Sequence, residues 1–271
     1  MRIKPKLAAQ ALHLPAAQRP GERLRLVRGG SANAEGARFA AEMFVADDGG
    51  PVRTIVGDMH RHWTGEEQSQ KTGLSNPYEG PTEHALIVES ELRADVLDYR
   101  TQAFRLRLLV GTTVREWICD HLRHIRVNGH DVVEAIECKP DVSYLDADER
   151  AVQAAAGKVI RGMGWRHRVL YHAGIVGGGE RQINFGTVYA HQTAEIPDGP
   201  LERFERLCIE RPSLTYRELR LALHPNRIKG SAMANALICR GRVSFELDRY
   251  LFDLSPVRLL PAPNFTSLIR F

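Results

Sequence analysis

Two acidic residues and a lysine lie where a β-hairpin would bring them together. Asp120 is followed 17 residues later by Glu137-Cys138-Lys139, and Asn128-Gly129 lies between them. Asn-Gly between two apolar segments is typical of a type I′ turn, because both turn positions need a positive φ. With this turn, Asp120 faces Glu137 across the hairpin, and Lys139 lies two residues further along on the same face.

This arrangement predicts a site for chemistry on a phosphate. Two carboxylates on neighbouring strands repel each other unless a cation offsets them, and Mg²⁺ prefers oxygen ligands of this kind. A lysine beside them can orient a hydroxide or stabilise a phosphate oxygen. The spacing resembles the catalytic signature of the restriction-endonuclease-like, or PD-(D/E)xK, nucleases.

The flanking sequence predicts the elements that must position these residues. Thr82 can cap a helix that runs to about Leu92 and carries Glu83 in its acidic first turn. Alternating apolar residues predict three strands, over 104–110, 114–127 and 132–138. Residues 1–81 are rich in Gly, Pro and polar side chains, and we expect little fixed structure there beyond short strand-like pieces such as Leu24–Val27.

A second helix and a further strand follow the hairpin. Asp146 can cap the helix, and six apolar residues at helical spacing form its buried face: Val152, Ala155, Ala156, Val159, Ile160 and Met163. Residues 168–172 then read as a buried strand. The resulting αβββαβ order is like that of the restriction-endonuclease core.

Several stretches resemble successive landmarks of the TnsA-type transposon endonucleases, and they occur in that family's order. The landmarks are Glu83-His84-Ala85, Val96–Gln102, Cys119–Leu122 and Ile136–Pro140, with weaker similarity at Ser69–Gly73 and Gly241–Phe245. The family generally has Gln-x-Lys-Pro where this chain has Glu137-Cys138-Lys139-Pro140. That difference restores the acidic residue of the wider nuclease superfamily.

The resemblance implies a set of site residues. Glu83, Asp120, Glu137 and Lys139 would be catalytic. The three carboxylates, with the backbone carbonyl of Cys138, would hold one or two Mg²⁺, for which Mn²⁺ would substitute. Gln102 would support the site from just outside it. Glu89 and Glu91 are alternatives to Glu83, although a charged Glu-Ser-Glu on an amphipathic helix is more often its wet face.

The C-terminal segment changes character after Pro200. It predicts an amphipathic helix over 201–208, a second helix opened by a Thr215–Glu218 capping box, a third helix from Ser231, and a β-hairpin. This order predicts a winged-helix-like domain. We therefore expect an α/β protein with three parts: an N-terminal extension packing on the core (1–74), a nuclease domain with a mixed sheet flanked by helices (75–198), and the winged-helix-like domain (199–271).

Charge and composition are compatible with a DNA-binding enzyme. The net charge is +4, and basic and acidic residues number 11 and 8 over 1–74, 14 and 18 over 75–200, and 12 and 7 over 201–271. Basic flanks around an acidic middle suit phosphate binding around a cation site. Four separated cysteines indicate neither a disulfide framework nor a zinc ribbon. The sequence shows no membrane span and no secretory signal, so we expect a cytoplasmic protein.

The preferred interpretation is a Mg²⁺-dependent DNA endonuclease of a transposition system, hydrolysing phosphodiester bonds at a transposon end. Its resemblance implies DNA, a transposase subunit and an ATP-dependent transposition regulator as partners. Two alternatives stay open: a restriction-like nuclease of a defence or repair system, and a non-catalytic adaptor with a decayed nuclease core. A zinc site at His121, His124 and His130 is disfavoured, because strand alternation places the first two on opposite faces.

Overall fold

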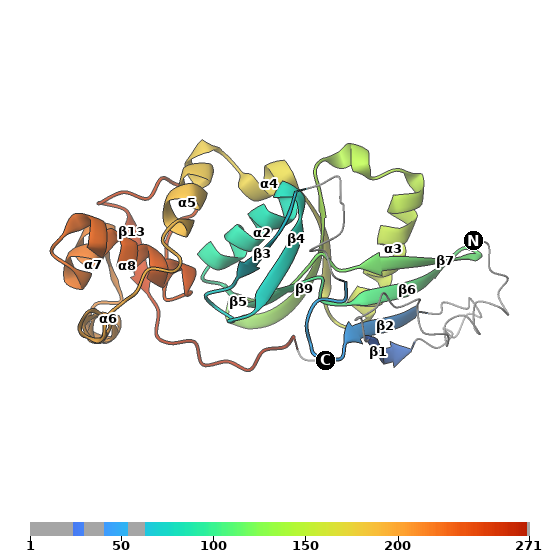
Figure 1. Ribbon diagram of the computed structural model, residues 1–271, viewed down its shortest axis with the longest axis horizontal. Helices are drawn as coiled ribbons and strands as arrows, with labels where there is room; N and C mark the ends of the chain where they lie inside the picture. The colour runs from blue at the N-terminus through green and yellow to red at the C-terminus, as the bar shows by residue number, and fades with distance from the viewer. Residues whose placement is uncertain (1–23, 30–40, 54–62, 270–271) are drawn as a thin grey trace.

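The computed structural model describes residues 24–29, 41–53 and 63–269, and its architecture is mixed α/β. Figure 1 shows three regions along the longest axis of the molecule. Helices α6, α7 and α8 lie at one end, α2 packs beside β5 and β9 in the middle, and β1, β2, β6 and β7 lie at the other end. No helix within the described ranges is long and apolar enough to cross a membrane.

The central sheet has the strand order β10-β9-β8-β5. Its strands are β5 (Val96–Thr101), β8 (His121–Val127), β9 (His130–Lys139) and β10 (Arg166–Tyr171). β9 and β10 are parallel, whereas the β5–β8 and β8–β9 pairs are antiparallel. Because β10 is an edge strand, it is only partly buried, and the prediction of a buried strand at 168–172 is wrong on that point.

The predicted hairpin is confirmed together with its register. Val127 pairs with His130, and His121 pairs with Ile136. The turn residues Asn128 and Gly129 have φ values of 52° and 81°, as a type I′ turn requires.

Helices α2 (Gly80–Leu92) and α3 (Ala147–Gly162) cover opposite faces of the central sheet. Alternate residues of β9 point to opposite faces, so Ile136 packs with α2 and Ala135 packs with α3. The Asp146 cap of α3 is confirmed, because its side chain accepts a hydrogen bond from the Glu149 amide. The predicted apolar face of α3 also packs into this core.

Helix α2 begins two residues before the predicted cap. Its N-cap is Glu79, and Pro81 lies in the first turn, where its missing N–H costs nothing. Thr82 lies inside the helix instead, within hydrogen-bonding distance of His172 (Oγ1 to Nδ1, 3.3 Å). The predicted end at Leu92 is confirmed.

A second sheet has the order β1-β2-β6-β7. Its strands are β1 (Leu24–Gly29), β2 (Ala41–Ala46), β6 (Arg105–Val110) and β7 (Thr113–Ile118). A separate hairpin consists of β3 (Thr64–Gln68) and β4 (Ser75–Glu79). The expectation of little fixed structure before residue 81 is therefore wrong for the described segments, since β2 is buried and pairs with both β1 and β6. Residues 1–23, 30–40 and 54–62 of this segment lie outside the described ranges.

The prediction of one strand over 114–127 is also wrong. The segment forms β7 and β8, which belong to different sheets and are separated by Cys119 and Asp120. The break is set by tertiary structure, because the Cys119 amide donates to the Phe104 carbonyl (3.0 Å) at the junction of the two sheets.

The C-terminal elements pack around a core that also includes Val88 and Leu92 of α2. The elements from β10 onward are α4 (His172–Val176), α5 (Gly179–Tyr189), α6 (Asp198–Glu210), β11 (Ser213–Thr215), α7 (Tyr216–Leu223), α8 (Arg227–Cys239), β12 (Val243–Ser244) and β13 (Pro256–Leu259). A three-stranded sheet has the order β11-β13-β12. The Thr215–Glu218 capping box is confirmed. Helix α8 begins before the predicted Ser231, because Asn226 caps it.

Candidate active site

A bend in a long β-ribbon creates the candidate site. The ribbon has two antiparallel strands: β5 continues into β6, and β7 continues into β8. The β5–β8 half belongs to the central sheet and the β6–β7 half belongs to the second sheet, so both strands cross between the sheets at the bend. At the bend the Gln102 amide donates to the Asp120 carbonyl at 3.1 Å. Gln102 has a φ of 50°, which is rare for a residue with a side chain. Asp120 and Gln102 therefore lie where regular pairing stops and side chains can face a pocket.

The structure brings the predicted residues to one pocket of about 340 Å³. Its lining includes all four residues predicted to be catalytic, Glu83, Asp120, Glu137 and Lys139, and also Cys138. These residues come from three places in the fold: the first turn of α2, the ribbon bend and the end of β9. Gln102 lies against the same site, because its Nε2 is 3.4 Å from Glu83 Oε2.

Glu137 is held by donors on both of its oxygens. Trp117 Nε1 donates to Oε2 at 2.6 Å, and Lys139 Nζ lies 2.6 Å from Oε1. Lys139 also pairs with Glu149 Oε1 at 3.1 Å. Burial opposes the charge on Lys139, but these two carboxylates outweigh burial and raise the pKa of Lys139. Lys139 is therefore a cation at neutral pH, held between Glu137 and Glu149.

Asp120 is positioned by the neighbouring strand. Its Oδ2 accepts a hydrogen bond from the Cys138 amide at 2.8 Å, which joins the ribbon bend to the end of β9. Burial raises the pKa of Asp120 well above its ordinary value, and the charges of Glu137 and Glu83 raise it further. Burial likewise raises the pKa of Glu137, against the opposing effect of Lys139.

Glu83 occupies the N-terminal end of α2, where the helix dipole favours negative charge. Its Oε2 accepts a hydrogen bond from the Glu79 amide at 3.0 Å. Burial nevertheless raises its pKa to about 7, with Glu79 and Glu137 adding to the rise and the Glu79 amide and Arg53 opposing it. The charge of Glu137 therefore disfavours ionisation of both Glu83 and Asp120, and the charge of Glu83 disfavours ionisation of Asp120.

The donor set fits a hard divalent cation in its chemistry, because it consists of carboxylate oxygens that repel one another. Within the described ranges, however, no group of three or more His, Cys, Asp and Glu side chains is arranged to hold a metal ion. The oxygens of Glu137 and one oxygen of Asp120 are bound by protein donors instead.

Three residues at the site are missed by sequence reasoning. Trp117 reads as a core residue, and it is indeed buried, but its indole N–H binds Glu137. Glu149 lies three residues after the Asp146 cap, and this Asp-x-x-Glu spacing could have placed it at the start of α3. Arg53 comes from the N-terminal segment, where no sequence pattern points to the site.

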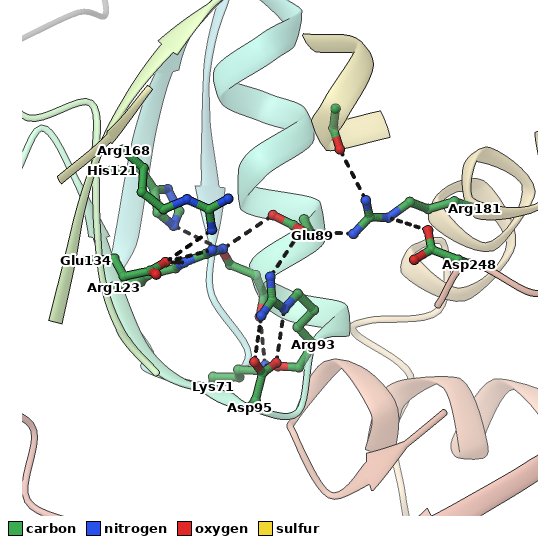
Figure 2. A network of polar contacts seen from close by, with 12 residues as sticks. Lys71, Glu89, Arg93, Asp95, His121, Arg123, Glu134, Arg168, Arg181 and Asp248 are labelled. Atoms are coloured by element: carbon green, nitrogen blue, oxygen red, sulfur yellow. Dashed lines mark hydrogen bonds and ion pairs between the residues drawn. The ribbon is translucent and has the colours of Figure 1, made fainter. Parts of the chain in front are cut away.

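The alternatives Glu89 and Glu91 lie elsewhere and are buried, so the wet-face interpretation of them is wrong. Figure 2 shows Glu89 among the side chains of Arg93, Arg123 and Arg181. Glu91 instead accepts hydrogen bonds from the hydroxyls of Ser69 (2.5 Å) and Tyr99 (2.7 Å). Neither residue lines the candidate pocket, so of the three glutamates of α2 only Glu83 reaches it.

Comparison with known proteins adds no family assignment. No family model matches the chain, and no curated protein matches it in sequence.

Proposed function

We propose that this protein is a metal-dependent DNA endonuclease of the TnsA type, which hydrolyses phosphodiester bonds at a transposon end. The observation that carries this proposal is the meeting of Glu83, Asp120, Glu137 and Lys139 in one pocket. Glu83, Asp120 and the Glu137–Lys139 segment are far apart in the sequence and come from three places in the fold. Asp120, Glu137 and Lys139, predicted from spacing, and Glu83, predicted from the resemblance, thus line the same pocket, which supports the proposal.

The order of elements supports the same proposal. The central sheet and its two helices follow the order α2-β5-β8-β9-α3-β10, which supports an αβββαβ restriction-endonuclease-like core. The first strand of this order is β5, whereas the strand predicted over 104–110 corresponds to β6 and belongs to the second sheet. The C-terminal elements follow the order α6-β11-α7-α8-β12-β13 around a small antiparallel sheet, which supports a winged-helix-like domain. A transposase subunit and an ATP-dependent regulator are the partners that the proposal implies.

In the proposed reaction, Glu83, Asp120 and Glu137 would hold Mg²⁺, together with the carbonyl of Cys138. When bound, such an ion would lower the pKa of a water and offset charge on the scissile phosphate. Lys139 places a positive charge beside the carboxylates, and Glu149 holds its Nζ in position at 3.1 Å. Gln102 and the Glu79 amide orient Glu83.

The test is nicking of supercoiled plasmid DNA in Mg²⁺ or Mn²⁺. We expect Asp120→Ala and Lys139→Ala to abolish nicking while circular dichroism and gel filtration match the wild type. The control is Asp131→Ala, which removes an exposed carboxylate at the far end of the same hairpin. Unchanged nicking by the Asp120 or the Lys139 variant would reject the proposed site.

A second candidate function is a non-catalytic adaptor that joins DNA to another protein. It is favoured by one observation, namely that the described carboxylates are not arranged to hold a metal. Calorimetric titration with Mn²⁺ separates the two functions. Binding that is lost in Asp120→Ala supports the nuclease, whereas wild-type protein that binds no metal and still binds DNA supports the adaptor.

A further inference from the structure

The candidate pocket has an excess of negative charge. Five of the described residues that line it are acidic, and two, Arg53 and Lys139, are cationic. Lys139 is already paired with Glu137 and Glu149. A DNA phosphate approaching the pocket therefore meets carboxylates, so a second positive group facing the substrate becomes important.

Arg53 lies at the pocket in a fixed position. The segment following β2 is attached to the ribbon bend, because the Val52 amide donates to the Gln102 carbonyl at 2.8 Å. Arg53 Nε donates to Gln102 Oε1 at 2.9 Å, and Nη2 donates to Glu79 Oε2 at 3.1 Å. These two bonds fix the plane of the guanidinium, and its side chain remains 35% exposed.

This geometry is suited to binding a phosphate. A guanidinium carries five N–H donors in a planar fork that matches phosphate oxygens, and the bonds to Gln102 and Glu79 use two of them. Orientation by two protein acceptors reduces the side-chain entropy that must be lost when a ligand binds. Arg53 also lowers the pKa of Glu83, which shows that its charge acts inside the site.

We propose that Arg53 binds a backbone phosphate of the DNA substrate and places the strand against the carboxylates. This inference rests on the proposed nuclease function and adds a substrate-binding residue to it. The residue comes from the N-terminal segment, outside the nuclease core and outside the landmarks that resemble the TnsA family. The alternative is that Arg53 only supports Gln102 and Glu79.

The experiment measures binding of a fluorescent 30-base-pair duplex by the full chain in EDTA, over a series of salt concentrations. Each phosphate contact adds about 0.9 to the slope of log K against log salt concentration. We expect Arg53→Gln to weaken binding and reduce the slope by about 0.9, and Arg53→Lys to retain most of the slope. A purely supporting role would leave the slope unchanged, because the number of neutralised phosphates would be the same.

The matched control is Arg126→Gln. It removes one positive charge from an exposed ion pair with Asp131, near the hairpin turn and away from the pocket. We expect its slope to match that of the wild type, which separates a local contact from the loss of net charge. An equal decrease in both glutamine variants would overturn the inference.

Plasmid nicking separates the failure of this inference from failure of the proposed function. If the wild type nicks DNA and the Arg53→Gln slope is unchanged, the function stands and the role of Arg53 is overturned. If the wild type does not nick but the slope decreases, the nuclease function fails, and Arg53 remains a phosphate-binding residue. In a nicking enzyme, we expect Arg53→Gln to raise KM more than it lowers kcat.

Discussion

The two ends of helix α2 use acidic residues in opposite ways. At the N-terminal end, Glu83 shares a pocket with Asp120 and Glu137, and burial together with the charge of Glu137 raises the pKa values of both Glu83 and Asp120. At the C-terminal end, Glu89 is surrounded by arginines, with Arg181 Nη2 at 2.9 Å and Arg123 Nη1 at 3.3 Å (Figure 2). The same helix thus carries one glutamate, Glu83, with little nearby positive charge to balance it, and another, Glu89, that is paired with several arginines.

This difference in charge balance distinguishes acidic residues that stabilise the fold from acidic residues suited to a functional site. A buried acid surrounded by cations serves the fold, because removing one partner leaves an uncompensated charge. Clustered acids that raise one another's pKa values cost stability, and such clusters are typical of functional sites. On this argument we assign Glu83 to the proposed site, whereas Glu89 links α2 to the central sheet and to α5 through its ion pairs with Arg123 and Arg181.

Arg123→Met should have the largest effect on stability. Arg123 is 1% exposed and pairs with Glu134 (2.9 Å) as well as Glu89. Its removal leaves two buried carboxylates with less compensation, so we expect the free energy of unfolding to fall by about 3–5 kcal/mol. Urea denaturation measures this loss, and Arg126→Met on the same strand is the control, expected to stay near the wild type. Equal urea midpoints for both variants would show that the buried ion pairs of Arg123 stabilise the fold no more than the exposed ion pair of Arg126.

Lys71→Met tests how the backbone at the C-terminal end of α2 is stabilised. Lys71 Nζ donates to the carbonyls of Ser90 (2.7 Å), Arg93 (2.5 Å) and Val96 (3.1 Å), which lie at and beyond the helix C-terminus. Loss of these bonds leaves carbonyls unsatisfied, and we expect a decrease of about 2–3 kcal/mol. Lys229→Met, at an exposed position of α8, is the control. Faster amide exchange confined to the last turn of α2 would identify the cause.

Asp120→Asn, unlike the two preceding variants, should increase the stability of the protein. Asparagine keeps an oxygen for the Cys138 amide but removes the repulsion from Glu83 and Glu137. We expect the free energy of unfolding in EDTA to rise by roughly 1–2 kcal/mol while nicking is lost, as at sites where function costs stability. Asp131→Asn, which removes an acid paired with Arg126, should give no such gain. If Asp120→Asn instead destabilised the protein, the acidic residues at both ends of α2 would be stabilising the fold, and the contrast between them would be wrong.

Local patterns predicted the hairpin and α3 well. The Asn128-Gly129 turn fixed the register of β8 and β9, and Asp146 fixed the start of α3. Such signals act over a few residues, so a sequence can carry them alone. Because the turn determines the register, the residue spacing by itself places Asp120 and Glu137 together.

Long-range features could not be predicted in this way. The break between β7 and β8 depends on backbone hydrogen bonds to Gln102 and Phe104, which lie between β5 and β6. The local sequence does not show these bonds, so 114–127 has the pattern of a single strand. Glu89 and Glu91 look like a wet helix face, because their partners lie on other elements. Arg53 reaches the pocket through a segment with no periodic pattern. Local patterns alone predicted only the part of the site that the hairpin assembles, whereas Glu83 and Gln102 were predicted through the family resemblance.

His167 lies beside the candidate site, and its substitution should have the smallest effect on stability. Its Nε2 donates to Gln153 Oε1 at 3.1 Å, and Gln153 Nε2 in turn donates to Glu149, the partner of Lys139. Burial lowers the pKa of His167 from 6.5 to about 4, with the charge of Arg161 adding to the effect.

Between pH 6.5 and 4 the unfolded chain therefore binds a proton at His167 that the folded protein does not. Wild-type stability should fall relative to His167→Gln as the pH drops through this window, since glutamine cannot titrate. The side chain is partly exposed, so solvent screening limits the expected difference to less than about 1 kcal/mol. Urea denaturation of both proteins at about pH 7 and about pH 4.5 measures it. A difference that does not change with pH would mean that the pKa of His167 is not shifted, and that this edge of the site is open to water rather than part of the buried fold.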